Sequence, residues 1–379
     1  MKIIHLLSNW KWTERSELVV DLALAQSRLG AEICFVCGRA PEENGAVADV
    51  AFYARQKGLD HIVVLPEMTK HIRLAAMFRG GRKIGEIIES VKPDVVHCHM
   101  RNAHLLAGLA GGQRHQIRWV RSAYDPEQIG WDWRSRWCYR KHTRGLIVMS
   151  EKARQSAISR SFPPERVAVI PPGIDLERFS PARSLNGQKD FGPLRNCFVA
   201  GVVSRIRKTR RLDIPLGLLH LLKDRYPSLR LLLVGRGRPG AVEKVVDGPA
   251  ADLGVQDRIF QAGYCEGDDL VAAYRQMRVL LYPMPGTDRT CRTVREALAA
   301  GIPVIAPDMG FLPELIQNGQ NGYLAEQSAE GFAAALKKLL DAPDAGEAMS
   351  RQALASARER FCWRHLAQAV LDFYRSVQV

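Results

Sequence analysis

Residues Cys197–Val234 read CFVAGVVSRIRKTRRLDIPLGLLHLLKDRYPSLRLLLV and hold the pattern that decides the fold. An uninterrupted apolar run, Cys197–Val203, leads into a basic loop, then into an amphipathic segment, Ile214–Arg225, and into a second apolar run, Leu229–Val234. Short apolar runs bounded by turn residues predict buried strands, and the longer amphipathic segment between them predicts a helix. Two buried strands joined by a helix predict a βαβ unit, and therefore an α/β fold with a parallel sheet.

The same alternation extends through the rest of the chain. The predicted elements are strands Lys2–Leu7, Glu32–Val36, His61–Leu65, Asp94–His97, Ile117–Arg121, Leu146–Met149, Arg258–Ala262, Val279–Tyr282 and Pro303–Ala306, with helices Glu17–Leu29, Ile72–Val91, Ala103–Gly111, Val242–Leu253, Asp268–Gln276 and Thr293–Ala300. Residues 181–194 are rich in Pro, Gly and polar side chains and predict a linker. We therefore expect two Rossmann-like domains that face each other across a cleft, at residues 1–180 and 195–360, and a helix at 361–379 that returns to the first domain.

Length and composition exclude several classes of protein. With 379 residues, of which 46% are hydrophobic and 25% charged, the chain has the composition of a globular protein. It has no apolar stretch of about 18 residues, and its first apolar run is too short for a signal peptide. We therefore expect a cytoplasmic protein. Cys34 and Cys37 form a C-x-x-C in a predicted strand without further ligands nearby, so we expect them to be small core residues.

The net charge of +14 indicates an anionic partner, and the charge is clustered. Residues 101–150 hold nine basic and three acidic residues, and residues 201–250 hold eleven and four. Neither first βα turn has a G-x-G-x-x-G fingerprint, and no Gly-x4-Gly-Lys-Ser/Thr occurs, so a nicotinamide enzyme and a P-loop protein are disfavoured. No recognised nucleic-acid module interleaves aromatics with the basic residues, so we expect no nucleic-acid partner.

Six segments, in order, resemble the motifs of family-4 glycosyltransferases with the GT-B fold. They are PPGIDLERFSP at 171–181, FVAGVVSR at 198–205, LLLVGRG at 231–237, AGYCEGDDLVAAYRQMRVLLY at 262–282, DRTCRTVREALAAGIP at 288–303 and FCW at 361–363. The resemblance covers nearly the whole chain. It implies a retaining, metal-independent transfer of a sugar from a nucleotide sugar, UDP- or GDP-linked, with no cofactor.

The resemblance also implies roles for residues of the second domain. Glu296 would accept the ribose hydroxyls, and Asp288, where the family usually has Glu, would reach the transferred sugar. Arg205 and Arg210 would stabilise the diphosphate leaving group, with Lys208 as a substitute for Arg210. The remaining donor-binding positions that match the family motifs are Gly235, Tyr264, Cys291, Arg292 and Thr293; Thr290-Cys291 replaces the family's Phe-Gly.

Three residues of the first domain are also candidates. In DVVHCH at 94–99 the period of a strand puts His97 and His99 on one face, and a metal site is disfavoured because no third ligand is apparent. The resemblance implies that His99 contacts the donor sugar, with His97 as a packed neighbour. The first loop lacks the family's Gly-Gly pair, so either Lys11 supplies a charge there or the loop, including Thr13, is reshaped for an unusual acceptor.

The expected acceptor is a glycan, a lipid-linked sugar or a phosphorylated glycolipid, in cell-surface polysaccharide or lipopolysaccharide assembly. Residues 70–83 and 114–144 mix basic side chains with Phe78, Trp119, Trp131, Trp133 and Trp137, which predicts docking on an anionic membrane at the inner face of the cytoplasmic membrane. Three alternatives remain open at this point: a sugar-nucleotide epimerase, a basic nucleic-acid-binding protein, and a family member that has lost catalysis.

Overall fold

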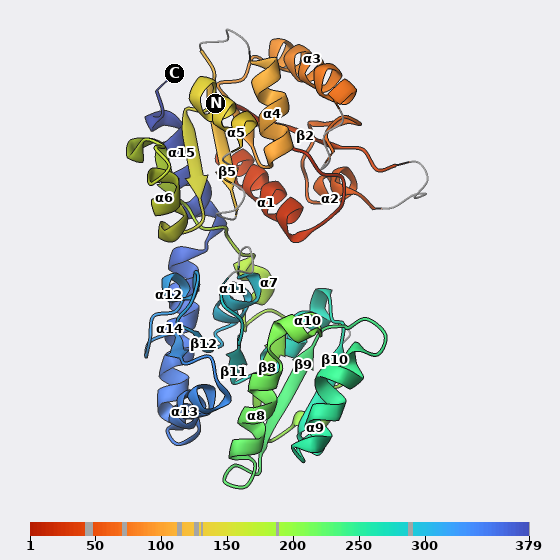
Figure 1. Ribbon diagram of the computed structural model, residues 1–379, viewed down its shortest axis with the longest axis vertical. Coiled ribbons are helices and arrows are strands. Elements are labelled where there is room, and N and C mark those ends of the chain that lie inside the picture. Colours follow the sequence, from red (N-terminus) through yellow and green to blue (C-terminus); the bar gives the residue numbers. More distant parts are fainter. Residues whose placement is uncertain are drawn as a thin grey trace. The chain divides into compact units, whose positions relative to one another are not determined.

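The computed structural model of the chain describes residues 1–41, 48–69, 74–111, 116–124, 129, 132–186, 189–286 and 291–378. It divides into two compact units, each with its own sheet (Figure 1). Unit 1 consists of Met1–Gly173 and Trp363–Val379, and unit 2 of Ile174–Cys362. The division therefore falls at Gly173, and the segment predicted as a linker belongs to unit 2.

Unit 1 is built on a seven-stranded parallel sheet in the order β3-β2-β1-β4-β5-β6-β7. Strands β1, β4 and β5 are buried along almost their whole length, because helices cover both faces. The strands are β1 (Lys2–Leu7), β2 (Glu32–Gly38), β3 (Ile62–Leu65), β4 (Val95–Cys98), β5 (Arg118–Ala123), β6 (Gly145–Val148) and β7 (Val167–Val169). The parallel sheet predicted for this part of the chain is confirmed, with β7 as an additional edge strand.

The helices of unit 1 are α1 (Glu14–Arg28), α2 (Val50–Gln56), α3 (Leu74–Val91), α4 (Arg101–Ala110), α5 (Trp133–Lys141), α6 (Glu151–Ile158) and α15 (Trp363–Ser376). Helix α3 continues through Gly80 and Gly81, although glycine has a low helix propensity. A Cβ atom on Gly80 would lie 3.1 Å from the Leu106 side chain, and one on Gly81 would lie 3.0 Å from Leu109. The two glycines thus allow α3 to pack closely against α4.

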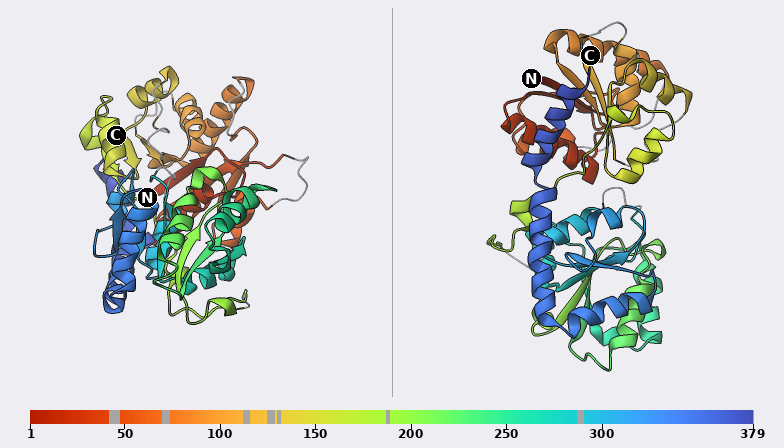
Figure 2. Two further views of the ribbon diagram at one scale, coloured as in Figure 1. Left: turned by 60° about the horizontal axis from the view of Figure 1, so that its bottom comes forward. Right: turned by 90° about the vertical axis from the view of Figure 1, so that its left-hand side faces the viewer.

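Unit 2 has a six-stranded parallel sheet in the order β10-β9-β8-β11-β12-β13. Its strands are β8 (Phe198–Val203), β9 (Leu229–Val234), β10 (Ile259–Gly263), β11 (Val279–Leu281), β12 (Val304–Pro307) and β13 (Gly322–Ala325). Its helices are α7 (Leu176–Phe179), α8 (Asp213–Leu222), α9 (Gly248–Asp252), α10 (Gly267–Gln276), α11 (Arg292–Ala299), α12 (Leu312–Leu315), α13 (Ala329–Leu340) and α14 (Pro343–Arg360). Figure 2 shows helices on both sides of this sheet.

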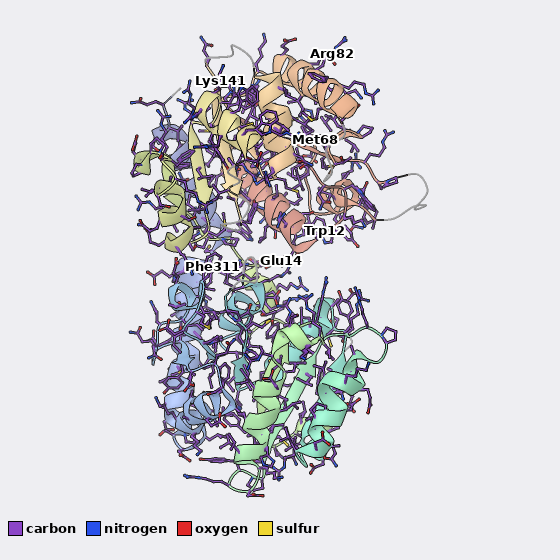
Figure 3. The ribbon with its side chains drawn as sticks, viewed as in Figure 1. Trp12, Glu14, Met68, Arg82, Lys141 and Phe311 are labelled. Carbon is purple, nitrogen blue, oxygen red and sulfur yellow. The ribbon has the colours of Figure 1, made fainter. Side chains whose placement is uncertain are left out.

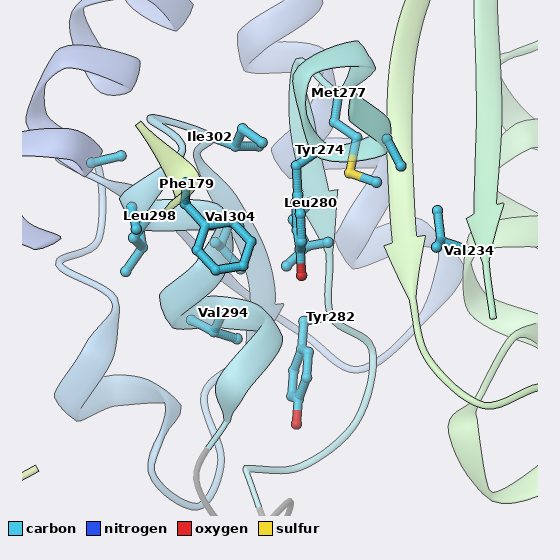
Figure 4. Packing of buried hydrophobic residues seen from close by; sticks show 14 of the residues in the cluster. Phe179, Val234, Tyr274, Met277, Leu280, Tyr282, Val294, Leu298, Ile302 and Val304 are labelled. Atoms are coloured by element: carbon cyan, nitrogen blue, oxygen red, sulfur yellow. The ribbon is translucent and has the colours of Figure 1, made fainter. Parts of the chain in front are cut away.

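Alternate residues of the unit 2 strands enter two different cores. Leu280 of β11 packs with Tyr274 and Phe179 on one face (Figure 4), whereas its neighbours Val279 and Leu281 pack on the other. The predicted helix Val242–Leu253 is split into a π turn, Glu243–Asp247, and the short helix α9. The split coincides with Pro249, which has no amide hydrogen for the helix ladder.

In both units the strand order reverses beside the first strand, between β1 and β4 and between β8 and β11. Open parallel sheets bind ligands at such a reversal, outside the carboxyl ends of the strands. A ligand-binding site is therefore expected at the loops that follow β1, β4, β8 and β11.

Candidate functional site

The loop after β8 is the basic cluster that the sequence singled out. Arg205, Arg207 and Lys208 are exposed there, and Arg210 is half-buried. A guanidinium nitrogen of Arg210 lies 2.7 Å from Sδ of Met284, which belongs to the segment after β11. The two loops at the strand-order reversal of unit 2 are thus in contact, with positive charge between and around them. Arg211, by contrast, forms an ion pair with Asp213.

Gly235 directly follows β9 and allows the loop after β9 to approach the loop after β8. Its φ angle of +147° lies in the region that favours glycine, and a Cβ atom there would lie 1.8 Å from the Ser204 carbonyl oxygen. The Ser204 amide donates to the Val234 carbonyl at 2.9 Å, which fixes the same approach. Gly235 is thus required by the backbone arrangement beside the basic loop.

Glu296, the residue expected to bind ribose, is a buried carboxylate on α11 with two donors. The Tyr274 hydroxyl donates to Oε2 at 2.8 Å, and Nε of Arg292 donates to Oε1 at 2.6 Å. Only 2% of Glu296 is exposed, and Tyr274 is fully buried. Burial, followed by the adjacent Glu296 carboxylate, raises the pKa of Tyr274 well above its usual range. The hydroxyl is therefore a permanent donor.

The two donors leave part of the carboxylate's capacity unused. Each carboxylate oxygen can accept two hydrogen bonds, whereas each oxygen of Glu296 accepts one from the part of unit 2 that the structure describes. A diol such as a ribose could donate to the remaining positions. Arg292 follows from the sequence as a donor-site candidate, whereas Tyr274 does not, although it lies inside one of the quoted motifs.

Cys291 and Thr293 frame the start of α11. Cys291 caps the helix with φ +45° and ψ +46°, a left-handed conformation in which the family's glycine would be unstrained. The Thr293 carbonyl lies 3.4 Å from the Tyr274 hydroxyl. Asp288 lies outside the described residues. Tyr264, another donor-binding candidate, directly follows β10 and is largely exposed. The Arg236 guanidinium lies 4.7 Å from the centroid of its ring.

The glycine-free loop of unit 1 is held by its own side chains. Thr13 caps α1 and accepts a hydrogen bond from the Ser16 amide, and the Asn9 side-chain amide donates to the Lys11 carbonyl at 2.9 Å. The Trp12 ring stacks on Tyr53 with 4.7 Å between centroids. Figure 3 labels Trp12 and Glu14, which precede and follow Thr13 in the sequence. Thr13 thus has a structural role, and the exposed Lys11 amine remains the charge of this loop.

His99 lies just after β4 and is fully buried. Its Nδ1 is 2.7 Å from the Tyr124 hydroxyl, and its Nε2 is 2.9 Å from Nδ1 of His5. His97 is packed and hydrogen-bonded, to Ser122 and Tyr374, as expected. The expectation that no third ligand lies near His97 and His99 is wrong, because parallel pairing of β1 with β4 places His5 opposite His97.

Two of the motifs prove to be structural partners. Gly173, from the Pro-Pro-Gly segment, lies against the Trp363 indole, where a Cβ atom would come within 2.4 Å of the ring. Next to this contact, the Ile174 amide donates to the Phe361 carbonyl at 3.0 Å. Cys34 and Cys37 are buried free thiols, which confirms them as core residues.

Comparison with known proteins gives consistent matches for both units. A family model described as "Glycosyltransferase Family 4" matches residues 16–178, and one described as "Glycosyl transferases group 1" matches residues 190–356. A D-inositol 3-phosphate glycosyltransferase of Saccharomonospora viridis is 31% identical over 219 residues, or 56% of this chain and 50% of the relative. The chain thus spans about half the length of the curated relatives it matches.

Solved structures resemble the whole chain in fold. Anabaena HepE in complex with UDP has a TM-score of 0.76 at 18% identity and covers 99% of this chain and 100% of its own. A glycosyltransferase from Rickettsia africae has a TM-score of 0.77 at 16% identity, with 99% and 98% covered. In the described part of the chain, no helix combines the length and apolar character needed to cross a membrane.

Proposed function

We propose, since the chain belongs to the family-4, group 1 glycosyltransferases with the GT-B fold, that it transfers a sugar from a nucleotide sugar to an acceptor. The observation that carries the proposal is the buried Glu296 carboxylate, held by Tyr274 and Arg292 in the same unit as the basic loop after β8. A carboxylate suits the ribose hydroxyls, and cations suit the diphosphate of the same ligand. The titles of solved neighbours that name UDP and UDP-glucose support this class of donor.

The proposed reaction retains the configuration at the transferred carbon and uses no metal ion. Arg205 and Arg210, with Lys208, stabilise the negative charge that grows on the diphosphate as the glycosidic bond breaks. The leaving phosphate takes the proton of the acceptor hydroxyl, so no protein base is required. Asp288 is assigned to the transferred sugar, and Tyr264 and residues 291–293 to the donor. In unit 1 we assign the loop of Lys11 and Thr13 and the segment that carries His99 to the substrates.

The first test is donor binding followed by turnover. UDP or GDP should raise the unfolding midpoint of the protein, and a panel of UDP- and GDP-sugars should identify the donor. Glu296→Gln keeps the size of the side chain and removes its charge, so both nucleotide binding and transfer should fall. Glu330→Gln, on helix α13 of the same unit, is the control and should change neither. Nucleotide binding that is equal in the two variants would contradict the assignment of Glu296.

Product analysis separates transfer from epimerisation. A transferase gives an acceptor-linked sugar and free nucleotide diphosphate, whereas an epimerase gives an altered nucleotide sugar without an acceptor. Two of the solved structures that resemble the fold are titled UDP-N-acetylglucosamine 2-epimerase, so both products should be measured. Full activity in the presence of EDTA is expected, and its loss would contradict the metal-independent mechanism.

For the acceptor we propose a glycan or lipid-linked sugar at an anionic membrane surface, reached through helices α3 and α5. Helix α5 has Arg134, Arg136, Arg140 and Lys141 and no acidic side chain. Trp133 at its start is 74% exposed, and Phe78 on α3 is 71% exposed. Both helices pack against α4, so they belong to the same part of unit 1. Exposed aromatics with a basic rim are typical of interfacial helices.

The structure narrows the residues available for docking. Trp119 is buried and cannot contribute to it, and Trp137 is half-buried beside His142. Trp131 lies outside the described residues. Arg82 on α3 and Lys141 on α5 (labelled in Figure 3) are exposed cations. The surface that remains therefore centres on Phe78, Trp133 and the basic side chains of α5.

Vesicle sedimentation tests this surface. The protein should bind vesicles with anionic lipid more than neutral ones, and salt should weaken the binding, since each basic residue near the surface contributes about 1 kcal/mol. Trp133→Ser with Arg136→Glu and Lys141→Glu should abolish it. Phe52→Ser replaces another exposed aromatic residue, on α2, and should not. Equal binding to neutral and anionic vesicles would contradict the proposal and indicate an acceptor in solution.

A further inference from the structure

Seven buried side chains of unit 1 are joined by hydrogen bonds in two halves that meet at Gln26. One half runs from Gln26 Oε1 to His5 Nε2 at 2.8 Å, from His5 Nδ1 to His99 Nε2 at 2.9 Å, and from His99 Nδ1 to the Tyr124 hydroxyl at 2.7 Å. These residues come from α1, β1 and the strand ends after β4 and β5. All four are buried.

The other half returns to the same glutamine. Gln26 Nε2 lies 3.4 Å from the Tyr374 hydroxyl, which lies 2.6 Å from His97 Nδ1, and His97 Nε2 lies 2.7 Å from Ser122 Oγ. Ser122 and Tyr124, at which the two halves end, are two residues apart at the end of β5. We call the seven residues the histidine ring: His5, Gln26, His97, His99, Ser122, Tyr124 and Tyr374.

The chemistry of the members allows only one direction once Gln26 is oriented. The amide nitrogen of Gln26 can only donate and its oxygen can only accept. Burial lowers the pKa of His5 to about 4 and holds those of His97 and His99 well below their usual range, so each imidazole is neutral and has one N–H and one lone pair. A neutral imidazole that accepts at one nitrogen must donate at the other.

The bonds then follow one another around the ring. Gln26 donates to Tyr374, Tyr374 to His97 Nδ1, and His97 Nε2–H to Ser122. Tyr124 donates to His99 Nδ1. His99 Nε2–H donates to His5 Nδ1, and His5 Nε2–H returns to the Gln26 oxygen. All three histidines are therefore the Nε2–H tautomer.

We propose that the histidine ring is a positioning device in which Gln26 and Tyr374 fix the tautomer and orientation of His99. His99 in turn holds Tyr124 and the strand end after β4 in position. Both nitrogens of the His99 imidazole are hydrogen-bonded inside the histidine ring, so neither is free for a sugar or a metal ion. The expected effect on sugar transfer rests on the function proposed above, whereas the expected tautomers of the three histidines do not depend on that function. Hydrogen bonds that all run in one direction reinforce one another, so opening the ring at one member disturbs the others.

The first test needs no variant. Two-dimensional 1H–15N correlation spectra of protein with 15N-labelled histidine assign the tautomer of each ring. His5, His97 and His99 should all be Nε2–H, and their signals should not change on addition of Zn²⁺. The reversed ring would make all three Nδ1–H, and that result, a mixture of tautomers, or Zn²⁺ binding would overturn the proposal.

The second test opens the ring at positions outside the substrate loops. Tyr374→Phe and Ser122→Ala each remove one hydroxyl, and each should change the tautomer populations of His97 and His99 together. Tyr139→Phe, which removes a buried hydroxyl that bonds the Ile129 carbonyl, is the control and should leave them as in the native protein. If the protein is a transferase, Tyr374→Phe should lower kcat by about two- to tenfold, the worth of one hydrogen bond, with the KM for donor unchanged.

The two readouts separate the two proposals. If the tautomers are as expected but the protein shows no transfer activity, the proposal for the histidine ring stands and the proposed function is contradicted. A changed His97 tautomer with an unchanged His99 tautomer in Tyr374→Phe, or unchanged kcat in an active enzyme, would contradict the positioning role.

Discussion

Replacing Tyr274 by Phe removes one hydroxyl from the Glu296 site and leaves the rest of the side chain in place. The ring packs edge-on against Phe179 with centroids 5.7 Å apart, and Phe can keep that contact. The lost bond joined a fully buried hydroxyl to a carboxylate that is 2% exposed. Hydrogen bonds to charged groups contribute about 1.5–3 kcal/mol, so we expect the free energy of unfolding of unit 2 to fall by about 2 kcal/mol. For a unit of this size that lowers Tm by about 4–8 °C.

Arg292 still donates to the other oxygen in this variant, so the carboxylate keeps one partner but is less well oriented. We expect nucleotide affinity, measured by calorimetry, to fall by about tenfold, since 1.4 kcal/mol corresponds to that factor. Tyr226→Phe is the matched control, because it also removes a hydroxyl bonded to a carboxylate, Asp341, at 2.6 Å, but near the surface. That bond is exposed to solvent and should contribute much less to stability than the buried one. Equal losses of stability in the two variants, or unchanged nucleotide affinity in Tyr274→Phe, would refute the reasoning.

Three further predictions concern the backbone, the histidine ring and a cavity. Gly235→Ala places a new Cβ 1.8 Å from the Ser204 carbonyl oxygen, so it should lower the free energy of unfolding in urea by more than about 3 kcal/mol. Gly240→Ala, at a position with positive φ but open space, should lower it by about 1 kcal/mol. Equal losses in the two variants would contradict the close approach at Gly235. The pKa of His5 is about 4 in the folded chain and 6.5 ordinarily, so the unfolded chain binds more protons between these two pH values. The contribution of the His5 imidazole to stability should therefore be constant above pH 6.5 and fall by about 3 kcal/mol as the pH drops to 4. Equal unfolding midpoints at pH 7 and pH 5 would contradict this prediction. A cavity of about 20 Å³ is lined by Ser122, Tyr124 and Trp363, and the indole Nε1 of Trp363 is buried without a partner in the described chain. A crystal structure should therefore show one water molecule in this cavity, and a dry cavity would contradict the prediction.

Most buried strands could be predicted because their apolar runs are continuous. Strand β9 has the predicted bounds, and β1 likewise. Helix α5 was missed, since its sequence WRSRWCYRK has almost no apolar periodicity and its buried side consists of Cys138 and Tyr139. Strand β7 was missed because it has only three residues.

The candidate site was predictable where it depends on local motifs and not where it depends on distant pairs. Glu296 could be found from its motif, whereas its partner Tyr274 lies 22 residues earlier. The histidine ring joins Gln26 to Tyr374, which are 348 residues apart. A signal was nevertheless present: His5 is a polar residue inside an apolar strand. A polar residue in a buried strand requires a polar partner on a neighbouring strand.

The order in which the chain passes through the two units constrains its synthesis. Unit 2 is one continuous segment, but the sheet of unit 1 lacks α15 until the chain returns at Trp363. A ribosome that adds 5–20 residues per second makes Tyr374 about 10–40 s after Gly173. During that interval β1, β4 and β5 have been made, but His97 and Gln26 have no hydroxyl from α15 to bond. The nascent first half is therefore exposed to chaperones and proteases for longer than the second, and slowing translation across unit 2 should lower the yield of folded protein.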